Sequence, residues 1–436
     1  MHKALLTLAF ASACSAALAA QQAQPQPAPA RVLSLRDAEQ AALANHPAIK
    51  AGQYVSEAAA QVVREARSAY YPTAFGAVTA AGATPEGARL AAGALNNPTI
   101  LDRFATGVGV SQLVSDFGRT KDLVSSTNLN AESSEKSVEA RRADVLLQVD
   151  RAYYDALRAR AVLRVAQETV STRQTVTDQV QALANANLKS GLDVSFAQVN
   201  LSDAQLLLVQ AQNDLQAAFA ALAVAMGDSA TTATYDLADE PLTTPPPNDA
   251  SGLIAQALRD RPDVAAQRLA AQGATEFAHA ERALWYPTVS ALGAAGVSPY
   301  HGNGILDHYA AGGVNVTIPI ANGSLFGARH AQAEFLAQAQ LEQSRDLENR
   351  VARDVTTAWL AARSAYQRLD LTNQLLAHAT DALDLAQARY NLGASSIVEL
   401  TQAQLNKTSA EIAQSTARYE YQARVSALRY QTGDLR

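Results

Sequence analysis

The sequence is poor in cysteine and in large aromatic side chains. Cys14 is the only cysteine, and Phe, Trp and Tyr together make up 6% of the 436 residues. A chain with one cysteine has no disulfide framework, and scarce aromatics disfavour one large globular core. Apolar residues still reach 48%, largely as alanine, which is a strong helix former. The composition therefore favours long packed helices, and the net charge of -6 disfavours a nucleic-acid partner.

Motifs for enzymatic chemistry are also missing. The sequence has no HExxH, no paired CxxC and no phosphate-loop lysine motif. The glycines near Gly107 fall in a strand-like pattern and lack the third glycine of a dinucleotide loop. The seven histidines are scattered without metal-ligand spacing. The sequence therefore predicts no catalytic, cofactor-binding or metal-binding residue.

The N-terminus has the features of an exported protein. Residues 1–19 are interpreted as a signal peptide, with an apolar run from Ala4 to Leu18 and a small-residue cleavage site at its end. Residues 20–33 are rich in Pro and Gln and predict a disordered leader. A membrane anchor is the alternative, but the apolar run is short. Cys14 would be removed with the signal peptide, or would be lipid-modified, for which Ala11 is a poor match.

Two halves of the chain repeat one layout. A helical pattern broken at Pro47 leads to an aromatic-Tyr-Pro element at Pro72, and the same pattern runs from Pro262 to Pro287. The two prolines are equally far apart in both halves, since 72 minus 47 equals 287 minus 262. This predicts a first repeat over residues 31–235 and a second over residues 250–436. The linker, residues 236–249, contains three consecutive prolines that cannot continue a helix.

Each aromatic-Tyr-Pro element precedes a pair of strand-like segments, at about 70–80 and 104–115 and at about 286–297 and 309–320. In the second segment of each pair, apolar residues alternate with small or polar ones, which is typical of a strand with one apolar face. The first segment of each pair is rich in small residues and is compatible with a strand. Segments of ~9–11 residues fit transmembrane barrel strands, with a soluble hairpin on the helices as the alternative. The residues predicted to face lipid are Phe104, Val108, Val110, Val314, Val316 and Ile318.

A helical hairpin follows each strand pair. Helical patterns over residues 119–188 and 326–392 would each span ~100 Å, and a shorter helix returns after each. The tips are expected near Gly191 and Gly393, since glycine suits a tight reversal. The step from Gly191 to Ala197 is shorter than the step from Gly393 to Ala403. This spacing predicts that the first hairpin lacks about one helical turn.

Together these features resemble the TolC-type outer membrane efflux proteins over nearly the whole mature chain. The most specific stretch is residues 388–404, containing RYNLG and IVELTQAQ, which is very similar to the second-half hairpin tip of that family. Residues 116–119 (DFGR) and both aromatic-Tyr-Pro elements also fit.

The resemblance implies a mainly α-helical fold with transmembrane β-strands, assembled as a homotrimer. Twelve strands would form one barrel in the outer membrane, and the helices would form an α-barrel across the periplasm. The protein would then be a passive duct for efflux or type I secretion, joined by a periplasmic adaptor and an inner-membrane pump or ABC exporter. Drugs, metals and secreted proteins would use a similar duct, so the cargo stays open. The rival interpretation is a soluble periplasmic coiled-coil adaptor or scaffold, which would not explain the strand pairs.

The resemblance also implies a periplasmic gate at the two hairpin tips. The residues that it assigns there are Gly191, Asp193, Tyr390, Gly393, Glu399 and Gln402. Tyr390 falls on the family's tip tyrosine, and Glu399 on an acidic ring position. Gln402 is neutral where the family has a second acid, and Ser395 replaces a basic latch residue. Asp193 would bond to Tyr390 as a latch, or would only cap the returning helix.

Overall fold

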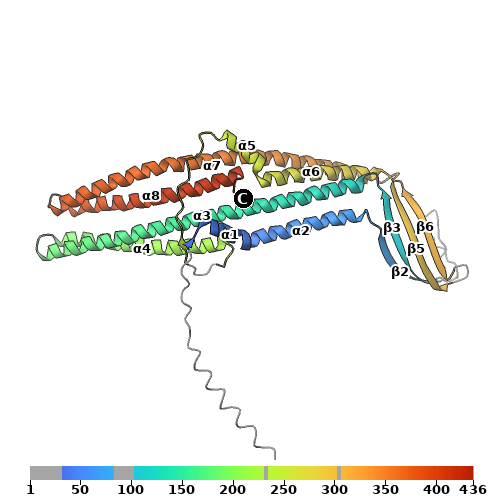
Figure 1. The fold of residues 1–436 in the computed structure, drawn as a ribbon, viewed down its shortest axis with the longest axis horizontal. Helices are drawn as coiled ribbons and strands as arrows, with labels where there is room; N and C mark the ends of the chain where they lie inside the picture. The colour runs from blue at the N-terminus through green and yellow to red at the C-terminus, as the bar shows by residue number, and fades with distance from the viewer. Residues whose placement is uncertain (1–31, 83–102, 230–233, 302–305, 436) are drawn as a thin grey trace, which may run out of the picture.

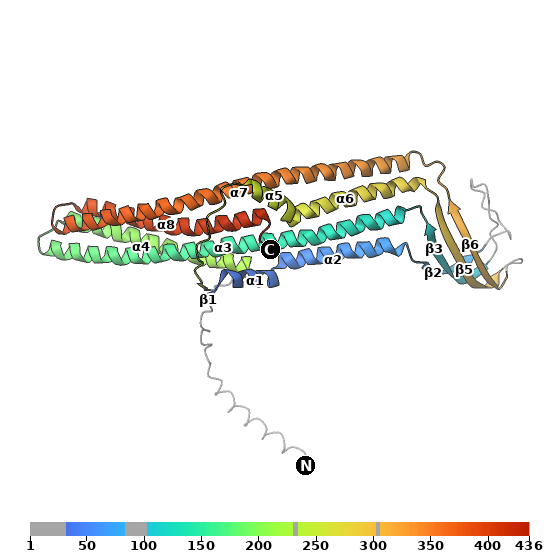
Figure 2. The same ribbon diagram turned by 45° about the horizontal axis from the view of Figure 1, so that its top comes forward.

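The computed structural model describes residues 32–82, 103–229, 234–301 and 306–435, and it has an elongated shape (Figure 1). A sheet lies at one end, and the tips of two helical hairpins lie at the other. Figure 2 shows the long helices running side by side between these ends. The predicted signal peptide and residues 20–31 of the predicted leader lie outside the described residues.

The two repeats contain matching elements in the same order. The first repeat consists of β1 (Val32–Leu33), α1 (Leu35–Asn45), α2 (Pro47–Ser68), β2 (Thr73–Ala81), β3 (Arg103–Ser115), α3 (Arg119–Asn185) and α4 (Gly191–Ala225). The second consists of β4 (Asp236–Leu237), α5 (Ser251–Asp260), α6 (Pro262–Arg282), the 3₁₀ turn η1 (Ala283–Trp285), β5 (Thr288–His301), β6 (His308–Thr317), α7 (Leu325–Asn391) and α8 (Ile397–Thr432). Each predicted proline break separates two helices, because proline starts a helix well but cannot continue one.

The long helices α3 and α7 each contain 67 residues, so each is ~100 Å long. Both begin after a residue in the left-handed region, Gly118 with φ of 105° and Ser324 with φ of 71°. The difference between these two positions, 324 minus 118, is called the repeat offset below. Both helices therefore leave the sheet through the same kind of turn.

The return helices α4 and α8 use buried alanine at every seventh position. The buried alanines in this register are Ala197, Ala204 and Ala211 in α4 and Ala403, Ala410 and Ala417 in α8. Such a repeat keeps one helix face on its neighbour through a left-handed supercoil, and alanine permits close approach. The repeat offset also relates the two sets, since 403 minus 197 equals 324 minus 118.

The large sheet is antiparallel, with strand order β2-β3-β5-β6. Its central pair, β3 and β5, joins the two repeats, and β2 and β6 lie at the edges. Strand β6 ends at Thr317, so Ile318 lies beyond it, contrary to the prediction that Ile318 is a strand residue. Pro319 follows directly, and a proline has no amide hydrogen to donate to a sheet.

A short parallel sheet of two strands, β1 and β4, lies at the middle of the molecule. Val32 pairs with Asp236 and Leu33 with Leu237. The Tyr153 hydroxyl, fully buried on α3, lies 2.9 Å from the Leu33 carbonyl oxygen. The prediction of a disordered leader up to residue 33 is therefore wrong for its last two residues. They are ordered because they pair with residues 236–237 and because Leu33 packs on a core cluster that includes Tyr153.

Candidate functional site

The two hairpin tips share one backbone design. Asn187 and Gly393, each the second residue after the end of a long helix, have left-handed φ values of 58° and 72°. Asparagine and glycine are the residues that most readily adopt this conformation after a helix. The return helices then begin after Ser190 and Ser396, whose side chains accept from the third backbone N–H of the helix.

This geometry corrects the prediction that the first hairpin lacks a helical turn. The repeat offset relates Asn187 to Gly393 and Ser190 to Ser396, since 393 minus 187 equals 396 minus 190. Gly191 is the first residue of α4, and the reversal occurs before it. The prediction was wrong because it took Gly191 as the equivalent of Gly393. Asparagine occupies that left-handed position in the first tip.

Asp193 caps its own helix. Its carboxylate accepts from the Ser190 backbone N–H at 3.0 Å and from the Ser190 hydroxyl at 2.8 Å, and its backbone N–H donates back to that hydroxyl. These bonds complete a capping box. Bonds from the Ser190 backbone and side chain, together with the nearby charge of Lys189, lower the pKa of Asp193. The capping interpretation of Asp193 is confirmed, and a gate role stays a prediction.

Tyr390 is buried where the two hairpins meet. Its side chain belongs to a cluster with Val180 of the first hairpin and Leu400 of the second. Its hydroxyl oxygen has no hydrogen-bond partner among the described residues. The ammonium of Lys189 lies 4.0 Å from the ring centroid. Burial raises the pKa of Tyr390, and the charge of Asp193 raises it further.

The other two polar residues assigned to the gate are exposed. Glu399 forms an ion pair with Arg389 at 2.9 Å, so its charge is partly neutralised within its own hairpin. The Gln402 amide donates to Asn406 at 3.0 Å along the same helix. Sequence reasoning placed Glu399 on an acidic ring position and did not include its ion-pair partner Arg389. The signal was available, because Arg389 precedes Tyr390 in the RYNLG stretch.

Direct polar contacts across the hairpins are few near the tips. The Asn200 amide of α4 donates to the Thr401 hydroxyl of α8 at 2.9 Å. Farther from the tips, Arg173 of α3 is 4% exposed, and one of its terminal nitrogens has no hydrogen-bond partner within the described ranges. Burial lowers the pKa of Arg173, and the charge of Asp203 opposes this shift. Sequence reasoning identified none of these residues, since a single polar residue in a long helical pattern carries no positional signal.

At the other end of the molecule, the sheet separates a valine face from a face of small residues. The strand register places five of the six predicted lipid-facing residues on one face: Phe104, Val108, Val110, Val314 and Val316. The opposite face contains two large aromatic side chains that cover glycines. The Phe75 ring covers Gly109, and the Tyr309 hydroxyl reaches Gly107 across β5. A methyl group at either glycine would collide with these side chains.

A pair of carboxyl groups is buried at the middle of the molecule. Asp150 of α3 is fully buried, and Glu39 of α1 is half-buried beside it. Burial, then the charge of Asp150 and a hydrogen bond with it, raise the pKa of Glu39 to about 7, while Arg429 opposes the shift. Burial also raises the pKa of Asp150, and Ser426 of α8 opposes that shift. Burial of the two carboxyl groups side by side therefore favours the protonated form of each.

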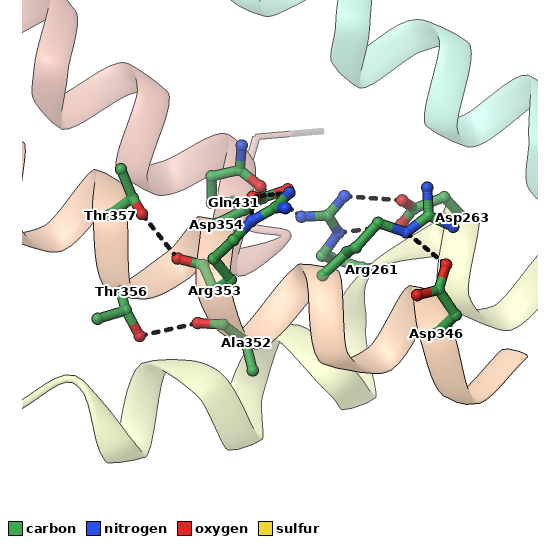
Figure 3. Close-up of polar contacts among 10 residues, drawn as sticks. Arg261, Asp263, Asp346, Ala352, Arg353, Asp354, Thr356, Thr357 and Gln431 are labelled. Atoms are coloured by element: carbon green, nitrogen blue, oxygen red, sulfur yellow. Dashed lines mark hydrogen bonds and ion pairs between the residues drawn. The ribbon is translucent and has the colours of Figure 1, made fainter.

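Arg261 joins the break between α5 and α6 to the end of α8, as Figure 3 shows. Its guanidinium donates to both carboxylate oxygens of Asp263, at 3.0 and 2.7 Å, and also to Gln431. It lies 5.7 Å from the centroid of the Tyr430 ring. Arg261 is 8% exposed, so these contacts replace the hydrogen bonds with water that the guanidinium loses on burial.

Within the described ranges, no group of three or more His, Cys, Asp or Glu side chains is arranged to bind a metal ion. No helix of the described chain contains an apolar stretch long enough to cross a membrane.

The comparison with protein families is decisive for the identity. The family model described as "Outer membrane efflux protein" matches residues 39–228 and 253–434, which covers both repeats. The chain belongs to the outer membrane efflux protein family. The two matched ranges fall on the two repeats, and the unmatched residues 229–252 contain the proline-rich linker. Membership in an outer membrane family favours the duct over the soluble coiled-coil alternative.

Individual relatives are distant but cover much of the chain. The toluene efflux pump outer membrane protein TtgC of Pseudomonas putida is 26% identical over 326 residues, which cover 72% of this chain and 65% of TtgC. Protein CyaE of Bordetella pertussis is 28% identical, with 91% of this chain and 82% of CyaE covered. A crystal structure of a membrane protein from Pseudomonas aeruginosa matches with a TM-score of 0.79 at 21% identity, over 94% of this chain and 98% of that one. The structural match shows the fold.

Proposed function

We propose that three copies of this chain form an outer membrane duct whose barrel contains twelve strands. The observation that carries the proposal is the four-stranded sheet with β2 and β6 at its open edges. Four strands do not close a barrel, and open strand edges are not tolerated in lipid because their backbone groups have no partner. Pairing β6 of one copy with β2 of the next closes the sheet after three copies.

The order of the helices supports the same seam. Near the sheet, neighbouring helices follow the order α2, α3, α6, α7, and nearer the tips the order is α4, α3, α8, α7. Helix α7 is thus outermost on one side, and α2 and α4 are outermost on the other. Apolar side chains exposed on these outer helices include Val199, Leu206, Val209, Leu371, Leu375 and Leu385. The next copy would bury them, since the outer helices of neighbouring copies face each other across the proposed seam.

The two faces of the sheet suit a water-filled barrel. The face with Val108, Val110 and Val314 would contact lipid. The face with Ser290 and Asn315, on which Phe75 and Tyr309 cover glycines, would line the lumen. The opposite orientation would put Asn315 and Ser290 against lipid, where polar side chains are disfavoured.

The hairpin tips would be the periplasmic end of the duct. Asp193, Tyr390, Glu399 and Gln402 lie there, at the end remote from the sheet. A periplasmic adaptor and an inner-membrane pump or ABC exporter would complete an efflux or type I secretion system. The relative TtgC is named as the outer membrane protein of a toluene efflux pump. It supports efflux as the class of activity for this chain and leaves its cargo open.

The number of copies tests the proposal. Native mass measurement of the full chain, extracted from an outer membrane fraction in mild detergent, should give three copies. Extraction should require detergent, because the barrel would be held by its lipid-facing residues. A stable monomer that is released without detergent would contradict the proposal and favour the soluble alternative.

A further inference from the structure

The contact between Lys189 and Tyr390 joins two hairpins that are far apart in the sequence. Lys189 lies in the turn of the first tip, and Tyr390 is the penultimate residue of α7. The lysine Nζ lies 4.0 Å from the ring centroid, well inside the ~6 Å range of a cation–π interaction. The neighbours of Lys189 in the turn, Leu188 and Ser190, are exposed, whereas Lys189 is half-buried. Its side chain therefore folds back on the second hairpin.

Tyr390 makes this contact with its ring. The side chain is 5% exposed, and Val176, Val180 and Leu400 surround it. Because the hydroxyl oxygen is buried without a partner within the described residues, a hydrogen bond from Tyr390 does not hold the tips together. The electron-rich face of the ring is the part of Tyr390 that can still attract a neighbouring cation.

The two tips are not interchangeable at this contact. By the repeat offset, Ser395 in the second tip is the equivalent of Lys189 in the first. Only the first tip therefore has a cation at this position. The hydroxyl oxygen of Ser395 is buried and unpartnered among the described side chains. One tip thus provides the ammonium, and the other provides the aromatic ring. This asymmetry suits a contact between the hairpins better than a contact within each.

Asp193 adds a negative charge in the neighbourhood of Lys189. The charge of Lys189 is one of the causes that lower the pKa of Asp193, after its bonds with Ser190. The capping box fixes the Asp193 carboxylate, so the position of this charge is set by the start of α4. The ring face and the fixed carboxylate both attract the ammonium.

We propose that Lys189 is a positioning residue that holds the tip of the first hairpin against the second through the ring of Tyr390. If the protein is the proposed duct, this contact keeps its periplasmic end narrow at rest. The contact itself does not depend on that function.

Hydrogen exchange on the full chain in detergent tests the contact directly. Lys189→Met removes the charge but keeps the length of the side chain, and Lys189→Arg keeps a cation that also binds aromatic faces. We expect amides in residues 191–200 and 386–391 to exchange about two- to fivefold faster in Lys189→Met, the effect of one cation–π contact. Lys189→Arg should exchange like the wild type, and so should Lys50→Met, which changes an exposed lysine on α2. Equal exchange in all four proteins would overturn the proposal.

Single-channel recording tests the effect on the gate. Lys189→Met should raise the resting conductance, while Tyr390→Phe keeps the ring and should resemble Lys189→Arg. Conductance raised by Tyr390→Phe and unaffected by Lys189→Met would assign the latch to the hydroxyl and overturn the proposal. Absence of any channel from the wild type would contradict the proposed function, and the exchange experiment would still decide the role of Lys189.

Discussion

Gly227, directly after the C-cap of α4, lies against the backbone of His46 at the break between α1 and α2. A methyl carbon added to Gly227 would lie 2.8 Å from the His46 Cα. The second repeat has the same arrangement, where an added methyl carbon at Gly433 would lie 3.0 Å from the carbonyl carbon of Asp260. Both glycines have left-handed φ values, 86° and 81°. In each repeat, the end of the return helix thus packs against the proline break between the first two helices of that repeat.

Gly227→Ala should destabilise the protein more than Gly393→Ala does. Both substitutions place alanine in the left-handed region, at a cost of about 1–2 kcal/mol. Only Gly227 would also collide with a neighbouring backbone, because nothing lies within 4 Å of the position that a methyl group would take at Gly393. Thermal unfolding of the detergent-solubilised protein compares the two variants. Equal losses of stability would show that the backbone at His46 shifts to make room for the methyl group without lowering the free energy of unfolding.

Much of this architecture could be predicted from the sequence, because it repeats. The equal spacing of Pro47 and Pro72 and of Pro262 and Pro287 located the helix breaks. Alternation located β3 and β6, and β2 and β5 were expected from the small, β-tolerant residues that follow each aromatic-Tyr-Pro element. The tips were harder, since Asn187 takes the left-handed conformation that the sequence pattern suggested for Gly191.

Other features depend on contacts between distant parts of the chain. The two-residue strands β1 and β4 are too short to show alternation, and they form because residues 32–33 and 236–237 meet. The contact of Lys189 with Tyr390 joins residues from different repeats. No local pattern indicates which lysine in a long chain lies on an aromatic ring. Sequence reasoning therefore located the tips without finding this contact.

Stability should fall as the pH rises through neutrality. Burial and Asp150 raise the pKa of Glu39 to about 7 from a usual value near 4.5. The folded state therefore retains a proton that the unfolded chain releases, so this contribution is fully present below pH ~4.5 and is lost as the pH rises through 7. Glu39→Gln should flatten this dependence in thermal unfolding between pH 5 and 8. Glu57→Gln, at an exposed position of α2, is the control. A wild-type midpoint that is constant over this range would contradict the shift.

Arginine at Val110 or Val316 should impair assembly. A charged side chain at the lipid face of a barrel costs roughly 2–4 kcal/mol near the bilayer midplane. Asn315→Arg lies on the other face of β6 and serves as the matched substitution. The measured quantity is the fraction of protein recovered as oligomer from the outer membrane. If Val316→Arg assembles normally and Asn315→Arg does not, the assignment of the two faces is reversed.

Substitutions at Arg389 and Glu399 should change ion preference in opposite directions. Glu399→Gln removes an acidic charge from the tip, so the cation preference of the channel should weaken. Arg389→Gln releases Glu399 from its 2.9 Å ion pair, so the cation preference should strengthen. Reversal potentials in a salt gradient across a planar bilayer measure both effects. No change in either variant would place this ion pair away from the ion path.

Cysteine cross-linking tests whether three copies share one barrel through a seam between β6 and β2. In a Cys14→Ala background, Thr79→Cys on β2 is combined with cysteine at each position of β6 in turn. Disulfides form only where Cα atoms come within about 4.4–6.8 Å. Thr79→Cys with Ala105→Cys, which pair within one chain, is the intramolecular control. In a closed ring of three copies, some β6 positions should give covalent dimers and trimers and nothing larger. Only monomers at every position, or a ladder that continues beyond the trimer, would contradict it.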